Sequence, residues 1–369
     1  MNAQDERFMS LALTLGRRGL GRAWPNPSVG AVIVRNDDGG PVIVGRGVTQ
    51  PGGRPHAETE AIRRAGNSAG GATIYVTLEP CSHHGKTPPC ADAIIAAGIA
   101  RVVSAIEDPN PNVAGQGHAR LRAAGIDVTV GVCAAEAARA NIGHITRVTK
   151  GRPHVLLKLA VSADGKVGLA GRKPVAITGD AARDHVHMIR AQHDAILTGI
   201  GTVVADNPQL TCRLPGMAAW SPVRVVLDSD LWLPANSALV ASAEVAPLWV
   251  MCGQSAAEER ERALKRSGVE VFRIPRTDAG LGLGHIVECL ANRGITRLMV
   301  ESGPRLAAAL LSGGLVDEIA LFHAPKTIGA DGLDALDGMP LTAITASPRF
   351  VLRNSEKVGY DRLDIYERV

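Results

Sequence analysis

The most constraining feature of this 369-residue chain is a histidine that is followed, after a long gap, by two cysteines. His56 lies two residues before Glu58, and Cys81 and Cys90 follow in the segment that begins Glu79-Pro80. One histidine and two cysteines are a typical set of three protein ligands for a catalytic zinc ion, which keeps its fourth position open. The fold must therefore bring separate segments of the chain to one point.

The local sequence predicts how these segments are arranged. His56 opens a predicted helix over residues 57–65, residues 73–78 are typical of a strand, and Cys90 opens a second helix over residues 91–97. A helix N-terminus favours the thiolate form of cysteine, which zinc needs. We expect both helix N-termini to converge on one Zn²⁺ per chain.

Glu58 stands where hydrolytic deamination needs a proton carrier. The pattern H-x-E with a later P-C is described for zinc-dependent base deaminases. Since zinc makes hydroxide available near neutral pH, we expect Glu58 to take a proton from water and return one to the leaving amine. Most such enzymes have two residues between the cysteines, whereas this chain has eight.

Other interpretations of these residues are open at this point. The cysteines could be buried simply as small hydrophobic side chains. His83 or His84 could supply a fourth ligand and make the zinc structural. A disulfide is not expected in a chain that otherwise has the features of a cytosolic protein. Because a structural site has no use for a proton carrier, Glu58 favours catalysis.

Bulk composition indicates a cytoplasmic enzyme and argues against several other classes. Aromatic residues make up only 3% of the chain, too few for a base-stacking surface, and the net charge of +4 suits a phosphorylated small molecule. No apolar run approaches the ~20 residues of a membrane span, and the N-terminus lacks the pattern of a signal peptide. We expect no nucleic-acid or membrane partner.

Two successions of strands and helices predict two α/β domains, over residues 1–149 and 150–369, with a boundary marked by glycine and proline near Gly151-Arg152-Pro153. The first is expected to be a three-layer α/β domain with a mixed sheet. Its helix 7–17 should carry Phe8, Leu11 and Leu15 on one apolar face, and a helix over 134–149 should lead out of the domain. The second should hold a mostly parallel sheet, covered on both faces, with an antiparallel hairpin at one edge.

The second domain shows weaker chemical signals. The glycine-rich stretches 199–204 and 280–284 do not match the G-x-G-x-x-G fingerprint, and both are predicted to be turns. The segment 301–306 ends a buried strand and starts a helix with Pro304 in its first turn. Its exposed N–H groups could receive a cofactor phosphate, or it could be an ordinary strand-to-helix turn.

At this point the motifs resemble a known family. The zinc segment with its long cysteine spacing, together with segments 25–30, 108–111, 158–165 and 205–211, resembles the bifunctional riboflavin-biosynthesis deaminase/reductase over nearly the whole chain. The resemblance implies a cytidine-deaminase-like domain that deaminates 2,5-diamino-6-(ribosylamino)pyrimidinone 5′-phosphate. It also implies a dihydrofolate-reductase-like domain that uses NADPH to reduce the ribosyl group to ribityl, and a homo-oligomer assembled through the reductase domains.

The resemblance further implies the residues of both sites. In the first domain Asn26 would contact the pyrimidine and Lys86 the phosphate. In the second, the substrate would be lined by Pro174, Arg190, Leu210, Arg213 and Glu301. NADPH would be bound by Ala160, Ala176, Thr202, Asp206, Ser229, Gly303, Pro304, Arg305, Leu306, Ala307, Ala308 and Ala309.

Four positions depart from the family pattern. Pro174 and Ala176 stand where the family often has serine and tryptophan, so only backbone contacts could survive there. Trp24 takes the place of a usual histidine, and Ala163 that of a common leucine. These departures leave one alternative open: another zinc nucleobase or nucleoside deaminase fused to an inactive or different reductase domain.

Overall fold

The computed structural model describes residues 2–83, 88–111, 113–169 and 175–369. The chain forms two compact units, residues 1–152 and 153–369. Within the described ranges, no helix combines the length and the apolar character needed to cross a membrane.

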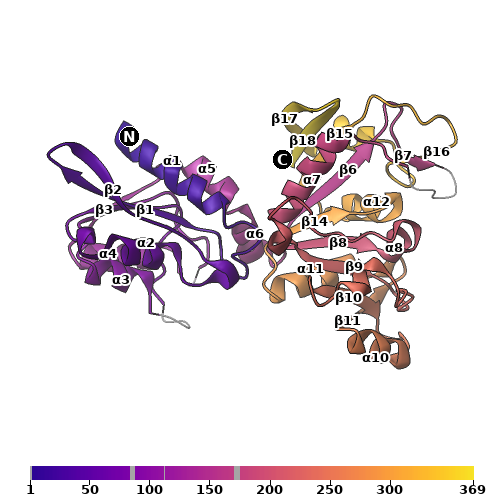
Figure 1. The fold of residues 1–369 in the computed structure, drawn as a ribbon, viewed down its shortest axis with the longest axis horizontal. Coiled ribbons are helices and arrows are strands. Elements are labelled where there is room, and N and C mark those ends of the chain that lie inside the picture. Colours follow the sequence, from indigo (N-terminus) through magenta and orange to yellow (C-terminus); the bar gives the residue numbers. More distant parts are fainter. Residues whose placement is uncertain (1, 84–87, 112, 170–174) are drawn as a thin grey trace. The chain divides into compact units, whose positions relative to one another are not determined.

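The first unit is a five-stranded sheet between two helical layers (Figure 1). In the strand order β2-β1-β3-β4-β5, β1 is antiparallel to both neighbours and β3, β4 and β5 are parallel, which confirms the predicted mixed sheet. Helices α1 and α5 cover one face, and α2, α3 and α4 the other. The elements are α1 (Ala3–Arg17), β1 (Gly30–Asp37), β2 (Gly40–Val48), α2 (Ala57–Ala65), β3 (Thr73–Val76), α3 (Cys90–Ala96), β4 (Arg101–Ser104), α4 (Gln116–Ala123), β5 (Asp127–Val130), α5 (Ala134–Ala140) and α6 (Ile142–Lys150).

The predicted buried face of helix α1 is wrong in part. Phe8 is buried as expected, but Leu11 is 40% exposed, and the other large buried side chains of the helix are Met9 and Leu13. The cause is a very close approach of helix and strand: a Cβ atom added to Gly30 on β1 would collide with the carbonyl oxygen of Ala12. Small residues at the contact therefore decide the rotation of the helix, and the large apolar residues follow it.

The predicted continuous helix over 134–149 is also wrong. It is broken at Asn141, which has φ −97° and ψ 12°, so that α5 and α6 are separate. The buried Asn141 amide donates a hydrogen bond of 3.0 Å to the carbonyl oxygen of Ala137. An asparagine side chain competes with the helix backbone in this way and favours termini over interiors.

The second unit contains a nine-stranded sheet in the order β11-β10-β9-β8-β14-β6-β15-β18-β17. All neighbours from β11 to β15 are parallel, and β18 is antiparallel to both β15 and β17, which confirms the predicted parallel sheet with an antiparallel edge. Its elements are β6 (His154–Val161), β7 (Lys166–Leu169), α7 (Asp180–Ala191), β8 (Ala195–Gly199), α8 (Ile200–Asp206), β9 (Val223–Leu227), α9 (Ala238–Ala241), β10 (Leu248–Gly253), α10 (Glu258–Arg266), β11 (Glu270–Ile274), β12 (Arg276–Thr277), β13 (Gly280–Leu281), α11 (Leu283–Asn292), β14 (Arg297–Glu301), α12 (Pro304–Ser312), β15 (Glu318–His323), β16 (Gly332–Asp334), α13 (Thr342–Thr345), β17 (Phe350–Val358) and β18 (Asp361–Arg368).

The parallel strands of this sheet determine where the candidate reductase site lies. The carboxyl ends of β8, β9, β10, β11 and β14 meet at one edge of the sheet, where parallel α/β folds bind ligands. The glycine-rich stretch 199–204, which we expected to be a turn, lies there as the end of β8 and the first turns of α8. Val203 is buried in the core of this unit, so tertiary packing outweighs the weak helix propensity of the stretch.

Candidate functional site

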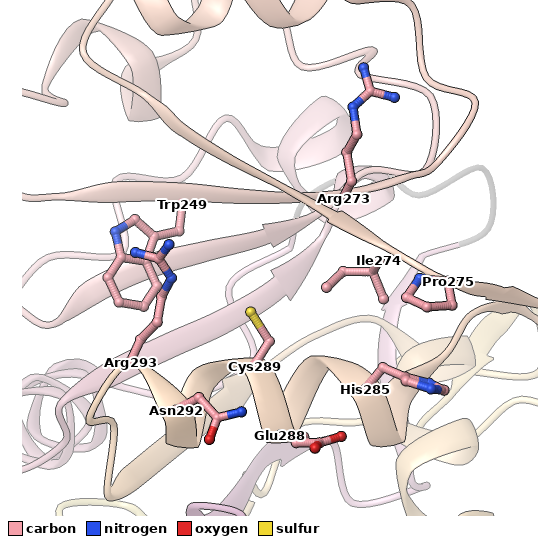
Figure 2. Close-up of a pocket in the computed structure, with 9 residues that line it drawn as sticks. All are labelled: Trp249, Arg273, Ile274, Pro275, His285, Glu288, Cys289, Asn292 and Arg293. Atoms are coloured by element: carbon pink, nitrogen blue, oxygen red, sulfur yellow. The ribbon is translucent and has the colours of Figure 1, made fainter.

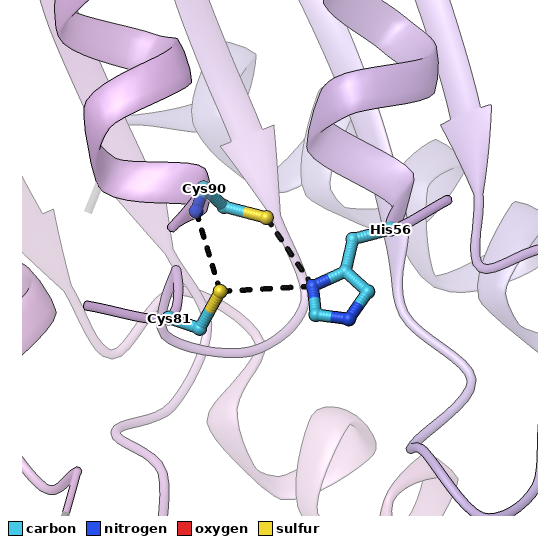
Figure 3. Close-up of side chains that lie close together, drawn as sticks. All are labelled: His56, Cys81 and Cys90. Atoms are coloured by element: carbon cyan, nitrogen blue, oxygen red, sulfur yellow. Dashed lines mark hydrogen bonds between the residues drawn. The ribbon is translucent and has the colours of Figure 1, made fainter. Parts of the chain in front are cut away.

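The three predicted metal ligands meet in the first unit (Figure 3). His56 is the N-cap of α2 and Cys90 is the first residue of α3, as the sequence predicts. Nδ1 of His56 lies 3.3 Å from Sγ of Cys90 and 3.7 Å from Sγ of Cys81. The backbone N–H of Cys90 also donates to Cys81 Sγ at 3.3 Å, which stabilises a thiolate there.

These distances fit a zinc ion. Tetrahedral zinc with ordinary Zn–N and Zn–S bonds places a nitrogen and a sulfur ligand about 3.5 Å apart. The observed separations of 3.3 and 3.7 Å lie on either side of that value. His83 is exposed and does not belong to the ligand cluster, while His84 and Lys86 lie outside the described residues. Three ligands from the described residues suit a catalytic site with one open position.

The electrostatics of the site agree with a proton-transfer role for Glu58. Its side chain is buried next to the ligand cluster, and this burial raises the pKa of Glu58 to about 7. Contact with Cys90, reinforced by His56, lowers the pKa of the Cys81 thiol to about 4. The pKa of the Cys90 thiol is raised by its contact with Cys81 and by burial. A bound zinc ion would favour the thiolate form of both cysteines.

Asn26, predicted to bind the pyrimidine, contacts the ligand set directly. Its side-chain amide lies 3.2 Å from Nε2 of His56, the ring nitrogen that faces away from the cysteines, and donates to the carbonyl oxygen of Gly53 at 2.9 Å. Groups that hold the second nitrogen of a ligating histidine fix the orientation of its ring.

Sequence reasoning missed the part played by Glu79, two residues before Cys81. The carboxylate is fully buried and accepts four backbone N–H groups, at 2.8 to 3.2 Å, from Asp108, Gly115, Gly117 and His118. These donors occupy the loop after β4 and the start of α4. Although Glu79, Glu107 and His118 cluster closely enough for a metal, the Glu79 oxygens are already occupied by these hydrogen bonds. We therefore interpret this cluster as structural support for the zinc loop.

In the second unit, an ion pair lies at the carboxyl end of β14. Arg190 on α7 donates from Nε and NH2 to the two oxygens of Glu301 at 2.7 and 2.9 Å, and from NH1 to the carbonyl oxygen of Thr211 at 3.1 Å. Burial acts to raise the pKa of Glu301, but the Arg190 guanidinium outweighs it and holds that pKa below its usual value. Both residues were predicted to line the substrate.

Lys158 is a further residue of this site that the sequence reasoning did not assign. It lies on β6 in register with Glu301 on the neighbouring strand. Burial lowers the pKa of the Lys158 ammonium, while Glu301 acts in the opposite direction. A lysine within an otherwise apolar, central strand was the signal available in the sequence.

Most residues predicted to bind NADPH lie at the same edge of the sheet. Gly303 is the N-cap of α12, and a Cβ atom built on it would lie 3.7 Å from Oγ1 of Thr202 on α8. Asp206 ends α8, and Ser229 follows β9. The first two turns of α12 hold the rest of the run, Pro304, Arg305, Leu306, Ala307, Ala308 and Ala309.

The remaining predicted residues are more dispersed. Ala160 lies near the carboxyl end of β6, and the carbonyl oxygen of the exposed Ala176 accepts a hydrogen bond of 3.4 Å from Lys326. Leu210 is buried with φ +56°, and the backbone N–H of Arg213 lies 3.4 Å from Nδ1 of His187. Pro174 lies outside the described residues.

Comparison with known proteins decides the family. The family described as the RibD C-terminal domain matches residues 153–363, and the cytidine and deoxycytidylate deaminase zinc-binding region matches residues 2–106. The riboflavin biosynthesis protein RibD of Escherichia coli is 42% identical over 371 residues, which covers 97% of this chain and 98% of that protein. The chain belongs to the RibD family. RibD of Aquifex aeolicus is 41% identical, with 99% of this chain and 98% of that protein covered.

Solved RibD structures have the same architecture. Acinetobacter baumannii RibD superposes with a TM-score of 0.87 at 36% identity, and 99% of each chain is covered. A Thermotoga maritima diaminohydroxyphosphoribosylaminopyrimidine deaminase/5-amino-6-(5-phosphoribosylamino)uracil reductase gives 0.84 at 37% identity, again with 99% of each chain covered. The expected cytidine-deaminase-like and dihydrofolate-reductase-like folds are confirmed. As a RibD, the chain is a bifunctional zinc deaminase and NADPH-dependent reductase of riboflavin biosynthesis.

The second unit also contains a pocket. A cavity of about 680 Å³ lies between β10, β11 and α11, and Figure 2 shows its lining side chains, which include Trp249, Arg273, His285 and Cys289. None of the site residues named above lines it. Cys289 points into the pocket from α11, and burial raises the pKa of its thiol, so the cysteine lacks the thiolate character of a nucleophile.

Proposed function

We propose that residues 1–149 deaminate 2,5-diamino-6-(ribosylamino)pyrimidinone 5′-phosphate and that residues 150–369 then reduce its ribosyl group to ribityl with NADPH. The observation that carries the proposal is the convergence of His56, Cys81 and Cys90 beside the buried Glu58. Supporting it is the similarity to the Thermotoga maritima protein, whose described activities are these two classes of reaction.

In the deaminase site, His56, Cys81 and Cys90 would hold the metal. Zinc, when bound, makes hydroxide available at neutral pH. Glu58 would take a proton from water as the water oxygen forms a bond to the amino-bearing ring carbon. It would then donate a proton to the exocyclic amine, which leaves as ammonia when the carbon–nitrogen bond breaks. Asn26 would bind the pyrimidine, and Lys86 the phosphate.

In the reductase site, NADPH, when bound, would supply a hydride to C1′ of the sugar, while the C1′–O bond of the sugar ring opens and the ring oxygen gains a proton. Arg190 and Arg213 would bind the substrate phosphate, since guanidinium groups match phosphate geometry. Glu301 orients Arg190 through their paired hydrogen bonds. Leu210 would line the substrate, and Pro174 could contribute backbone contacts only. The residues at the start of α12 would bind the cofactor phosphates through free N–H groups.

We also propose that the protein is a cytoplasmic homo-oligomer that associates through the second unit. None of the six cysteines, all of which lie in the described ranges, forms a disulfide, which suits a reducing compartment. Strand β17 lies at the sheet edge, and its Val351 and Leu352 are 41% and 48% exposed. A strand at the edge of a sheet has unpaired backbone N–H and C=O groups, with which a second copy of the same strand could pair. Light scattering on the purified protein tests the oligomeric state directly.

The function is tested by supplying the diaminopyrimidinone ribosyl phosphate to the zinc-loaded protein, with and without NADPH, and identifying products by mass spectrometry. We expect the deaminated product without NADPH and the ribityl product only with it. Deamination without any reduction would contradict the reductase assignment and direct attention to Pro174 and Ala176. Absence of ammonia release would contradict the zinc-site assignment.

A further inference from the structure

At the carboxyl ends of β9, β10 and β11, Ser229, a predicted NADPH-binding residue, is surrounded by side chains that neither reaction has so far used. Ser229 follows β9, and its carbonyl oxygen accepts hydrogen bonds from the N–H of Gly253 at 3.0 Å and from NH2 of Arg276 at 2.9 Å. Arg276 also pairs with Asp230. Three neighbouring strand ends are thus joined around Ser229, at the edge where the cofactor residues lie.

The guanidinium of Arg276 occupies space that is available only because residue 253 is a glycine. A Cβ atom built on Gly253 would collide with Nε of Arg276 and lie 3.0 Å from its Cζ and NH2 atoms. Glycine at this position therefore allows the guanidinium to lie flat against the end of β10. The side chain of Arg276 remains 41% exposed, so its other N–H groups can reach a ligand.

A second arginine and an aromatic ring complete the group. The guanidinium of Arg260, on α10, stacks over the ring of Trp232 at 3.8 Å from the centroid, and its NH1 donates to the carbonyl oxygen of Asp230 at 3.1 Å. Trp232 is 63% exposed. Large exposed aromatic rings next to arginine are favoured surfaces for a nucleobase.

The two acidic residues that follow β9, Asp228 and Asp230, are not free to bind a ribose. Dinucleotide sites that take NAD place an acidic side chain on the ribose 2′-hydroxyl, whereas those that take NADP use a nearby arginine for the 2′-phosphate. Asp228, at the end of β9, is fully buried and accepts the N–H of Leu233 at 2.7 Å. The exposed Asp230 is already paired with Arg276.

From this arrangement we infer that Arg276 and Arg260 bind the 2′-phosphate of NADPH beside Ser229. The exposed ring of Trp232 would then stack against the adenine. The two arginines thereby set the preference of the reductase for the phosphorylated cofactor. The inference rests on the reductase function proposed above and deepens it. Two guanidinium groups against the single carboxylate of Asp230 leave a net positive charge for a phosphate dianion.

The test compares Arg276→Ala and Arg260→Ala with the wild type in the full-length protein. Calorimetry measures the binding of adenosine 2′,5′-bisphosphate and of 5′-AMP, two probes that differ only in the 2′-phosphate. Turnover gives the ratio of kcat/KM for NADPH to kcat/KM for NADH. Each variant should lower the bisphosphate affinity and the NADPH/NADH ratio by about ten- to a hundredfold, the usual effect of losing a charge-assisted hydrogen bond.

Two further variants distinguish the effect of the position of the Arg276 guanidinium from the effect of positive charge in general. Gly253→Ala keeps both arginines but displaces the Arg276 guanidinium, so it should also lower the ratio. Arg266→Ala removes one positive charge from the other end of α10 and should leave the ratio unchanged.

The outcomes distinguish this inference from the proposed function. Equal losses for the two probes, or an unchanged preference in Arg276→Ala, would overturn the inference while leaving reduction intact. A wild type that binds the bisphosphate in preference to 5′-AMP but reduces no substrate would support the 2′-phosphate site and contradict the reductase proposal instead.

Discussion

The carboxylate of Glu79 and the backbone N–H of Gly117 form a hydrogen bond of 2.8 Å, although they are 38 residues apart in the sequence. Gly117 also lies so close to the zinc loop that a Cβ atom on it would collide with the carbonyl oxygen of Pro80. Through these contacts the start of α4 is packed against the chain immediately before Cys81. The position of one zinc ligand therefore depends on a loop that supplies no ligand.

From this contact we expect Glu79→Gln to impair the deaminase site without touching a ligand. In the variant, an NH2 group replaces one carboxylate oxygen, and this oxygen accepts hydrogen bonds from two backbone N–H groups in the wild type. Because an NH2 group cannot accept these bonds, two buried donors lose their partner, at a cost on the order of 3 kcal/mol. Zinc affinity should fall and deamination should slow at least tenfold, while reduction of supplied aminouracil substrate is unchanged. Glu107→Gln, which alters an exposed carboxylate of the same cluster, is the matched control. Normal zinc retention in Glu79→Gln would contradict this role.

Glu58→Gln should separate metal binding from chemistry. The substitution keeps the size of the side chain and all three ligands, so zinc content should stay at one per chain, but the proton carrier is lost. We expect deamination to fall by about a hundred- to ten-thousandfold. Cys81→Ser and Cys90→Ser should instead lose zinc together with activity. Zinc content by atomic absorption and ammonia release, measured on the same samples, will show whether zinc binding is retained when deamination is lost.

Arg190→Lys should affect only the reductase. Lysine cannot reproduce the paired hydrogen bonds that Arg190 donates to Glu301. The negative charge of the buried Glu301 carboxylate would therefore be stabilised by fewer hydrogen bonds. We expect kcat/KM for ribityl formation to fall about ten- to a hundredfold with no change in ammonia release. Arg183→Lys, an exposed position on the same helix, should behave as the wild type. A variant with normal reduction would show that the pair is dispensable.

His193 should make the stability of the second unit depend on pH. Burial lowers the pKa of His193 to about 3, and its Nδ1 lies 2.7 Å from the carbonyl oxygen of Ile189. The unfolded chain binds a proton near the ordinary pKa of 6.5. Below that pH the unfolded state therefore holds more protons, and stability falls with falling pH down to the folded pKa.

The expected loss from this one group is about 2 kcal/mol between pH 6.5 and about pH 5. His193→Phe removes the titrating group, so its free energy of unfolding should change less over that range, whatever its absolute value. Urea unfolding followed by tryptophan fluorescence at several pH values measures the free energy of unfolding of the variant and of the wild type. Identical pH dependences in variant and wild type would exclude a contribution from His193.

Local patterns in the sequence were enough to predict much of the fold. The helices that carry His56 and Cys90 begin at those residues, because capping positions and apolar periodicity are local properties. The parallel sheet with its antiparallel edge follows from the alternation of elements. The error at Leu11 has a different origin, since the rotation of α1 is decided by its backbone contact with Gly30 on another element.

By itself, the sequence determined the chemistry of this protein: one histidine, two cysteines and a glutamate at spacings that suit zinc-assisted deamination, followed by a reductase-like second half. Only the tertiary structure decided which distant groups support that chemistry. Glu79 meets the start of α4, and Arg276 meets Gly253, because loops and strand ends far apart in the chain converge in the fold. Such contacts are set by packing and by the pairing of buried polar groups, and no local pattern encodes them.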